Sequence, residues 1–215
     1  MPWGPYNSVR WLLGPFFFPP ANYSLIPPAR ERHYILPFRI TPTTMPSAVP
    51  TSTNHPSAEP VPTHPDRIRV NRSTKAFGSG AYSLIDLPAG AVFAPITGTT
   101  PGVKAYTSVQ TGPDSHIELN SDLVFCNHSC DPSLVFDMSR MEVRVVDDKP
   151  LRAGDALTFF YPSTEWEMDQ PFQCTCGASE CRGWISGAKT MSAEELDGYW
   201  LNGFIVELLN ERKRD

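Results

Sequence analysis

Four cysteines are placed where they could bind a single metal ion. Cys130 stands apart, whereas Cys174, Cys176 and Cys181 are crowded together further along the chain. Four thiolates suit a closed, tetrahedral zinc site. Disulfides are the alternative, but a secreted disulfide scaffold is usually smaller and evenly paired, and this chain has 5 cysteines. The spacing therefore favours a structural zinc site with these four residues as ligands.

A short polar segment carries the first of these cysteines. Residues 127–132 read Asn-His-Ser-Cys-Asp-Pro and directly follow the apolar run 123–126. The remaining cysteine, Cys126, lies in that apolar run, so we expect it to be a small buried hydrophobic residue. A single histidine such as His128 is usually a structural residue with satisfied hydrogen bonds. On its own, the segment therefore indicates only a turn beside a buried core.

Two further sequence features indicate a functional site only in combination with other motifs. Residues 154–161 form a strand-like run that ends in Tyr161, and most tyrosines in that position only complete a core. The triplet Gly78-Ser79-Gly80 precedes another strand-like run, and glycine pairs usually mark ordinary turns. Neither feature predicts a site by itself.

Taken together, these segments resemble a known family, the SET domain followed by a post-SET zinc motif. The similarity covers residues 68–187, and its most specific parts are the Asn-His-Ser-Cys run, the strand ending in Tyr161 and the clustered cysteines. SET domains are the fold of S-adenosylmethionine (SAM)-dependent protein lysine methyltransferases. The resemblance implies a mainly β fold with few helices, built of small β-sheets, with a knot-like C-terminal threading and a C-terminal helix.

The resemblance also implies a role for individual residues. Tyr161 would be the catalytic residue, and Phe159, two positions before it, would line the substrate channel and leave room for higher methylation. Zinc would be held by the four cysteines and would support a segment that folds over the cofactor. The residues expected to contact SAM are Gly78, Ser79, Gly80, Asn127, His128 and Tyr161.

The implied reaction asks for positioning more than for covalent help. A methyl group passes from a sulfonium to a neutral amine, so orientation and exclusion of water can supply most of the acceleration. A free lysine, with a pKa of about 10.4, is protonated in water. A narrow apolar channel beside a positive sulfonium would lower that pKa and favour the nucleophilic amine. We expect Tyr161 to orient the amine without acting as a general base.

The sequence departs from the family in the region expected to recognise a peptide. Residues 98–127 are a short stretch where the family usually inserts a larger subdomain, and residues 107–121 predict no helix. Phe160 also replaces the expected Asp or Asn before the tyrosine. Three functions follow: methylation of a protein lysine, for example in a histone; a non-catalytic zinc-containing binding or regulatory module; or methylation of a small molecule.

The composition divides the chain into four parts. Residues 1–66 hold fifteen of the 23 prolines and predict an extension with an aromatic-rich start, a short strand between residues 30 and 40, and a linker. We expect the SET domain at residues 67–166, the post-SET zinc segment at 167–187, and a C-terminal helix and tail at 188–215. For that helix, a capping box of Ser192 and Glu195 is followed by apolar residues at four-residue steps, which are Leu196, Trp200, Phe204 and Leu208.

The net charge, the hydropathy and the cysteines indicate which classes of partner and which cellular location to expect. The formal net charge of −5 favours a basic peptide over a nucleic acid as partner. No apolar run is long enough to predict a transmembrane segment. Reduced cysteines favour an intracellular protein, in the nucleus or the cytoplasm.

Three apolar residues near the cysteines, Phe172, Trp184 and Ile185, could form a wall for adenine or merely pack around the metal loop.

Overall fold

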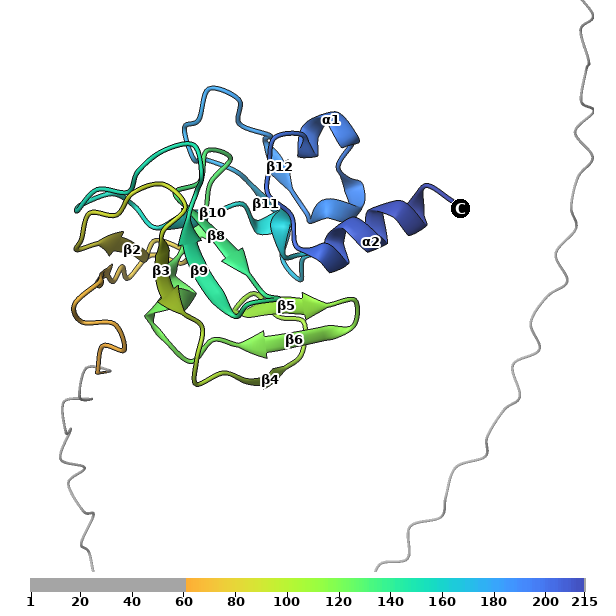
Figure 1. Ribbon diagram of the computed structural model, residues 1–215. Coiled ribbons are helices and arrows are strands. Elements are labelled where there is room, and N and C mark those ends of the chain that lie inside the picture. The colour runs from red at the N-terminus through yellow and green to blue at the C-terminus, as the bar shows by residue number, and fades with distance from the viewer. Residues whose placement is uncertain (1–60, 215) are drawn as a thin grey trace, which may run out of the picture. The chain divides into compact units, whose positions relative to one another are not determined.

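The computed structural model describes residues 61–214 and shows a mainly β domain with two α-helices (Figure 1). The predictions for the aromatic segment, the strand between residues 30 and 40 and most of the linker lie outside these residues. The strands are β1 (Ile68–Asn71), β2 (Gly80–Ser83), β3 (Val92–Pro95), β4 (Thr100–Gly102), β5 (Ser108–Gly112), β6 (Ser115–Glu118), β7 (Asn127–His128), β8 (Leu134–Asp137), β9 (Glu142–Val145), β10 (Thr158–Phe159), β11 (Phe172–Gln173) and β12 (Trp184–Ile185).

The largest sheet brings the predicted site segments together. Its strand order is β3-β9-β8-β10-β7, and β10 pairs in parallel with both β8 and β7. Strand β10 therefore inserts between two strands that precede it in sequence. In this register Phe159 lies opposite His128, so the residues after β10 begin beside the Asn-His pair.

The core behind this sheet is built from the inward faces of β3, β8 and β9. Phe93, Phe136 and Val143 are fully buried. Strand β9 alternates between buried and partly exposed residues, as a half-buried strand does, whereas all four residues of β8 are buried. Phe136 also stacks on Phe159 with 4.1 Å between ring centroids. Because the ring of Phe159 is held in this way, the end of β10 has a fixed position over the core.

Two short elements differ from simple strands. Most of the apolar run 123–126 forms a 3₁₀ helix, Asp122–Phe125, and Cys126 after it is 2% exposed, which confirms the burial predicted for this cysteine. The predicted strand 156–161 is regular only at Thr158–Phe159. Tyr161 instead opens a second 3₁₀ helix, Tyr161–Ser163, because Pro162 cannot donate to a strand ladder. This turn directs the chain after Tyr161 away from the sheet.

Residues 98–127 form the reduced insert. As predicted, residues 107–121 contain no helix, and they form the hairpin β5–β6, which β4 extends to a three-stranded sheet of order β4-β6-β5. Figure 1 shows this sheet at the lower edge of the domain, with α2 (Gly203–Arg212) next to β5. The sheet supplies one wall of the site described below.

The prediction of one C-terminal helix through residues 196, 200, 204 and 208 is wrong. The capping box is confirmed, since Glu195 N–H donates to the Ser192 side chain, but α1 (Ala193–Leu196) ends after one turn. Gly198 has a φ of 79°, in the left-handed region that stops a helix. The four-residue spacing therefore runs across a loop, and α2 is a separate helix.

Asn202 explains why the chain breaks before α2. Its side chain is buried; it accepts a hydrogen bond from Met138 N–H (2.9 Å) and donates to the carbonyls of Phe136 (3.0 Å) and Ser163 (2.9 Å). An uninterrupted helix would not place the amide at this junction. These bonds satisfy buried backbone groups next to the 3₁₀ helix that follows β10. Asn202 therefore fixes the C-terminal segment against the region that carries Tyr161.

Among residues 61–214, no helix is long and apolar enough to cross a membrane.

Candidate active site and zinc centre

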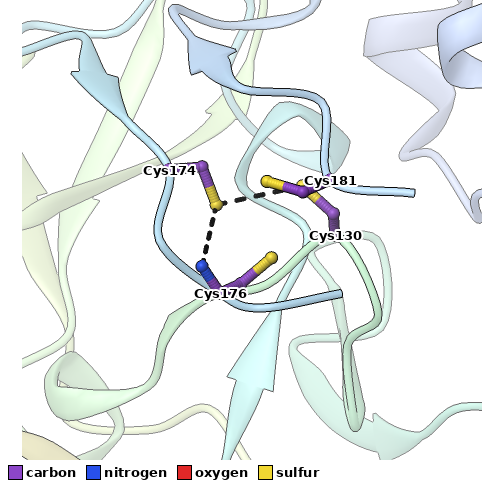
Figure 2. Close-up of side chains that lie close together, drawn as sticks. All are labelled: Cys130, Cys174, Cys176 and Cys181. Carbon is purple, nitrogen blue, oxygen red and sulfur yellow. Dashed lines mark hydrogen bonds between the residues drawn. The ribbon is translucent and has the colours of Figure 1, made fainter. Parts of the chain in front are cut away.

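The four predicted zinc ligands converge. Figure 2 shows Cys130, from the loop after β7, facing Cys174, Cys176 and Cys181 from the segment between β11 and β12. Their Sγ atoms all lie within 4.8 Å of one another, and none of the four forms a disulfide. A tetrahedral ion with zinc–sulfur bonds of about 2.3 Å requires sulfurs about 3.8 Å apart. The donor set and its spacing therefore fit zinc.

Hydrogen bonds favour a negative charge on two of these sulfurs, although burial outweighs them and raises the pKa of the Cys130 and Cys174 thiols. Arg182 N–H donates to Cys130 Sγ over 3.3 Å, and Cys176 N–H donates to Cys174 Sγ over 3.4 Å. Burial opposes ionisation of Cys176, but hydrogen bonds from backbone groups and from neighbouring thiols outweigh it and lower the pKa of its thiol to about 6. A thiolate that forms readily is the species that binds zinc.

His128 connects the cysteine cluster to Tyr161. Burial lowers the pKa of His128 to about 4, so the ring is neutral at physiological pH. Its Nδ1 accepts a hydrogen bond from Tyr161 N–H (3.1 Å), which leaves the ring proton on Nε2, 3.4 Å from Cys130 Sγ. The backbone of Tyr161 is therefore held by the same histidine that contacts Cys130, a candidate metal ligand.

Several predicted residues line one cavity of about 570 Å³. Asn127, His128, Phe159 and Tyr161 form part of its wall, and Cys174 and Cys176 border it from the cysteine segment. A cavity of this size is typical of a small-molecule or cofactor site. The structure thus brings together the Asn-His pair, the tyrosine and part of the cysteine cluster.

Tyr161 faces this cavity as a neutral phenol. Its hydroxyl donates to the carbonyl of Cys126 over 3.2 Å. Burial raises the pKa of the phenol, and the nearby Cys126 and Glu165 raise it further. A phenol with its proton committed to a carbonyl retains lone pairs that can accept a hydrogen bond. The geometry therefore suits orientation of a donor group in the cavity and does not favour proton abstraction by Tyr161.

The glycine segment lies behind the cavity wall. Phe77 lines the cavity, whereas Gly78, Ser79 and Gly80 do not. The Asn127 side-chain amide donates to the carbonyl of Ser79 over 2.9 Å, and a Cβ atom on Gly80 would lie 3.1 Å from the Asn127 amide nitrogen. The absence of a side chain at Gly80 therefore permits this close approach, and the segment's described contact with the site runs through Asn127.

Of the three apolar residues considered as an adenine wall, only Phe172 lines the cavity. It packs against His128 with 5.6 Å between ring centroids. Ile185 is fully buried beside the cysteines, and Trp184 is 59% exposed. Packing around the metal loop explains Ile185, and nothing in the described residues gives Trp184 a role.

Glu165 is a cavity residue that the sequence did not reveal. Its side chain is only 12% exposed, and Oε1 accepts hydrogen bonds from Gln110 N–H (3.0 Å) and from the Thr164 hydroxyl (3.3 Å). Burial raises the pKa of its carboxyl group to about 7, although these hydrogen bonds and the charge of Lys104 oppose the rise. Its setting depends on β5 and β6, which no local pattern links to residue 165.

Glu165→Gln is expected to stabilise the domain at pH 8 by about 2 kcal/mol relative to the parent chain, with a gain that shrinks towards pH 5. The folded carboxyl has a pKa of about 7 against an ordinary value of 4.5, so the folded state binds more protons between these values and loses stability as the pH rises. The amide has no such dependence. His116, Lys104 and Tyr161 are the titratable groups that face Glu165.

Thermal unfolding at a series of pH values measures this difference. Glu167→Gln is the matched control, because Glu167 has a side chain 55% exposed and pairs with Lys104 and Lys189 at the surface. Identical pH dependence in the two variants would contradict the assigned burial of Glu165.

Comparisons with known proteins place the chain in a family. It is 56% identical over 149 residues to the methyltransferase flvH of Aspergillus flavus, a match that covers 69% of this chain and 84% of the relative. It is also 36% identical over 67 residues to a histone-lysine N-methyltransferase, H3 lysine-36 specific, of Chaetomium globosum, covering 29% of this chain and 7% of that protein. The comparison with family models found no match.

Among solved structures, the chain is similar to KRYPTONITE in complex with mCHH DNA, an H3(1-15) peptide and SAH. The TM-score is 0.41 at 23% identity, over 54% of this chain and 29% of that one. The extent of the match to the Aspergillus flavus protein, with the similarity to the histone-lysine enzymes, shows the relationship: the chain belongs to the family of SET-domain methyltransferases. The strand order and the cysteine cluster agree with the fold and the zinc motif expected from the sequence.

Proposed function

We propose that the chain transfers a methyl group from SAM to an amine nitrogen, with the cavity beside the cysteine cluster as its active site. The observation that carries this proposal is the convergence of Asn127, Phe159 and Tyr161 on one cavity of about 570 Å³. Asn127 and the pair Phe159 and Tyr161 come from two separate segments of the chain, and each residue matches a position of the SET motif. The relative from Aspergillus flavus, named a methyltransferase, supports the reaction class.

When bound, SAM supplies an electrophilic methyl group on a sulfonium. We assign its binding to Asn127, and to His128 and Phe172 on the wall nearer the cysteines. The segment Gly78–Ser79–Gly80, which does not line the cavity, would take part through the hydrogen bond that Asn127 donates to Ser79. The residues present fit such a ligand, because the cavity combines aromatic surface with the Asn127 amide. Zinc at the four cysteines would hold the segment that carries Phe172 in place.

The protein's own contribution to transfer is orientation and exclusion of water. Phe159 is 5% exposed and stacked on the core, so it provides a rigid apolar wall. Tyr161 lies 4.7 Å from it between ring centroids and can accept a hydrogen bond from the amine. In such surroundings the ammonium form of the acceptor is disfavoured and its pKa falls. The neutral amine then has an open lone pair directed by Tyr161.

Two acceptors remain in this proposal. A protein lysine, for example in a histone, is supported by the names of the histone-lysine relatives. A small amine is favoured by a specific observation, the insert of residues 98–127, which is a small sheet without a helix. Reduced zinc thiolates agree with work in a reducing compartment, so we expect the protein inside the cell, in the nucleus or the cytoplasm.

Methyl-labelled SAM distinguishes these outcomes. The zinc-loaded full chain is incubated with the label and, in separate reactions, with a protein extract and a metabolite extract. We expect labelled amine in one extract, and binding of SAM by calorimetry in the absence of either. A zinc-loaded, folded chain that binds no SAM would contradict the proposal, and binding without labelled product would favour the non-catalytic module.

A further inference from the structure

We propose that Glu165 binds a second, positively charged nitrogen of the substrate, so that the acceptor carries two basic groups. The inference rests on the proposed function and adds the class of substrate to it. The nitrogen that receives the methyl group would lie at Tyr161, and the other would lie at the carboxylate. Free diamines, basic amino acids and basic protein segments share this chemistry.

The first argument is the position of an unpaired oxygen. Glu165 lines the cavity, and its Oε1 is held by Gln110 and Thr164. Its Oε2 accepts no hydrogen bond from the described residues, and His116 Nε2 lies 3.9 Å from it, beyond hydrogen-bonding distance. One half of the carboxylate is thus fixed while the other is free to accept an N–H group.

The second argument is that no cation pairs directly with the carboxylate, since Lys104, whose charge acts on it, pairs with Glu167 instead. Within residues 61–214, no lysine or arginine forms an ion pair with Glu165. Burial, and then the charge of Lys104, lower the pKa of His116, so its ring is neutral at physiological pH. A largely buried carboxylate without a cation is costly unless a partner arrives. A positively charged ligand group would remove that cost and hold the carboxylate in its ionised form.

The third argument is the aromatic lining of the same cavity. Phe77 and Tyr106 line it and contact each other edge to face, with ring centroids 6.0 Å apart. Both are unusually exposed for aromatic residues, at 78% and 66%. Cations are attracted to aromatic faces, so this pair suits the passage of a positively charged substrate. An apolar substrate would find no partner for Glu165.

The fourth argument is the closeness of Glu165 to Tyr161. Glu165 N–H donates to the Tyr161 carbonyl over 2.9 Å, so one turn of chain carries both side chains. The negative charge of Glu165 also raises the pKa of the Tyr161 phenol. Because both side chains are fixed to this turn, they define the distance between the two nitrogens of a bound substrate. We therefore expect the site to select substrates by the length of the chain that joins these nitrogens.

Calorimetry on the zinc-loaded full chain, saturated with S-adenosylhomocysteine, tests the inference. The probes are linear diamines of graded length, monoamines of the same lengths, a peptide with lysine beside arginine, and the same peptide with citrulline for arginine. We expect binding at least about tenfold tighter for the dibasic member of a pair, the range of a hydrogen bond to a charged group. A preference shown by the diamines would identify a free small amine as the substrate, and a preference shown by the peptide would identify a basic protein segment.

Two variants assign the preference to one residue. Glu165→Gln keeps the shape and the Oε1 hydrogen bonds, and we expect it to abolish the preference while leaving affinity for S-adenosylhomocysteine unchanged. Glu167→Gln removes an equal charge at the surface and should retain the preference. Glu165→Asp, which restores the charge on a shorter side chain, is expected to recover part of it and to shift the favoured length.

The results that would overturn the role of Glu165 differ from those that would overturn the proposed methyl transfer. Equal binding of dibasic and monobasic probes, no binding of any probe, or an unchanged preference in Glu165→Gln would each overturn the inference. Weaker binding of S-adenosylhomocysteine in Glu165→Gln would also overturn it, because the carboxylate would then serve the cofactor. A Glu165-dependent preference without methyl transfer would support the cation site and contradict the methyltransferase assignment.

Discussion

Cys176→Ser is expected to lose the zinc ion and the ordered structure of residues 167–187, and to lower the melting temperature by about 10 °C. The four sulfurs lie within 4.8 Å of one another and are separate thiols, so a bound zinc ion would link Cys130 to the segment between β11 and β12. A structural zinc contributes directly to folding. For a domain of this size, a decrease of about 3 kcal/mol in the free energy of unfolding corresponds to this shift in melting temperature.

Metal content, thermal unfolding and hydrogen exchange measure this result. We expect one zinc per parent chain, little in Cys176→Ser, and loss of protection confined largely to residues 167–187. Cys126→Ala is the matched control, because Cys126 is a buried cysteine outside the cluster and should retain the ion. A freshly purified, reduced parent chain without zinc, or a variant that keeps it, would contradict the assignment.

Tyr161→Phe is expected to reduce kcat for methyl transfer by about 10²-fold, the usual loss when one positioned polar group is removed from an active site. The phenol is fixed by its bond to the Cys126 carbonyl, and the Tyr161 backbone is fixed by His128. Since phenylalanine keeps the ring, binding of SAM and the melting temperature should change little. The loss is therefore expected in turnover more than in affinity.

Single-turnover transfer from labelled SAM to the acceptor found in the extracts measures the effect. Tyr82→Phe is the control, because Tyr82 on β2 is half-buried and lies outside the cavity lining. Equal rates for the parent chain and Tyr161→Phe would remove the proposed role. Unfolding of the variant, seen by its melting temperature, would show instead that the hydroxyl is structural.

The sequence predicted those parts of the site that lie in continuous motifs. The cysteine spacing predicted the cluster of four thiols, and the run 154–161 indicated Tyr161, because each depends on neighbours within a few positions. The sequence also indicated the absence of a helix in residues 107–121. It could not show Glu165 as a site residue, because its partners Gln110 and His116 meet it only when the β5–β6 hairpin packs against the turn after β10.

At the C-terminus, the sequence predicted an element that the structure does not contain, a single continuous helix. Apolar residues at four-residue steps from Leu196 predicted one helix, and local periodicity was correct only in two separate pieces. The break depends on Asn202, whose hydrogen-bond partners lie in β8, in the turn after it, and in the second 3₁₀ helix. Long-range hydrogen bonding therefore outweighed periodicity, and only the glycine at residue 198 hinted at the loop.

The most direct test of the central claim is a crystal structure of the zinc-loaded chain grown with S-adenosylhomocysteine. The account predicts one zinc ion bound by Cys130, Cys174, Cys176 and Cys181, and the ligand in the cavity lined by Asn127 and Phe172, with its sulfur directed towards Tyr161. A ligand bound on another face of the domain, with this cavity filled only by solvent, would contradict it.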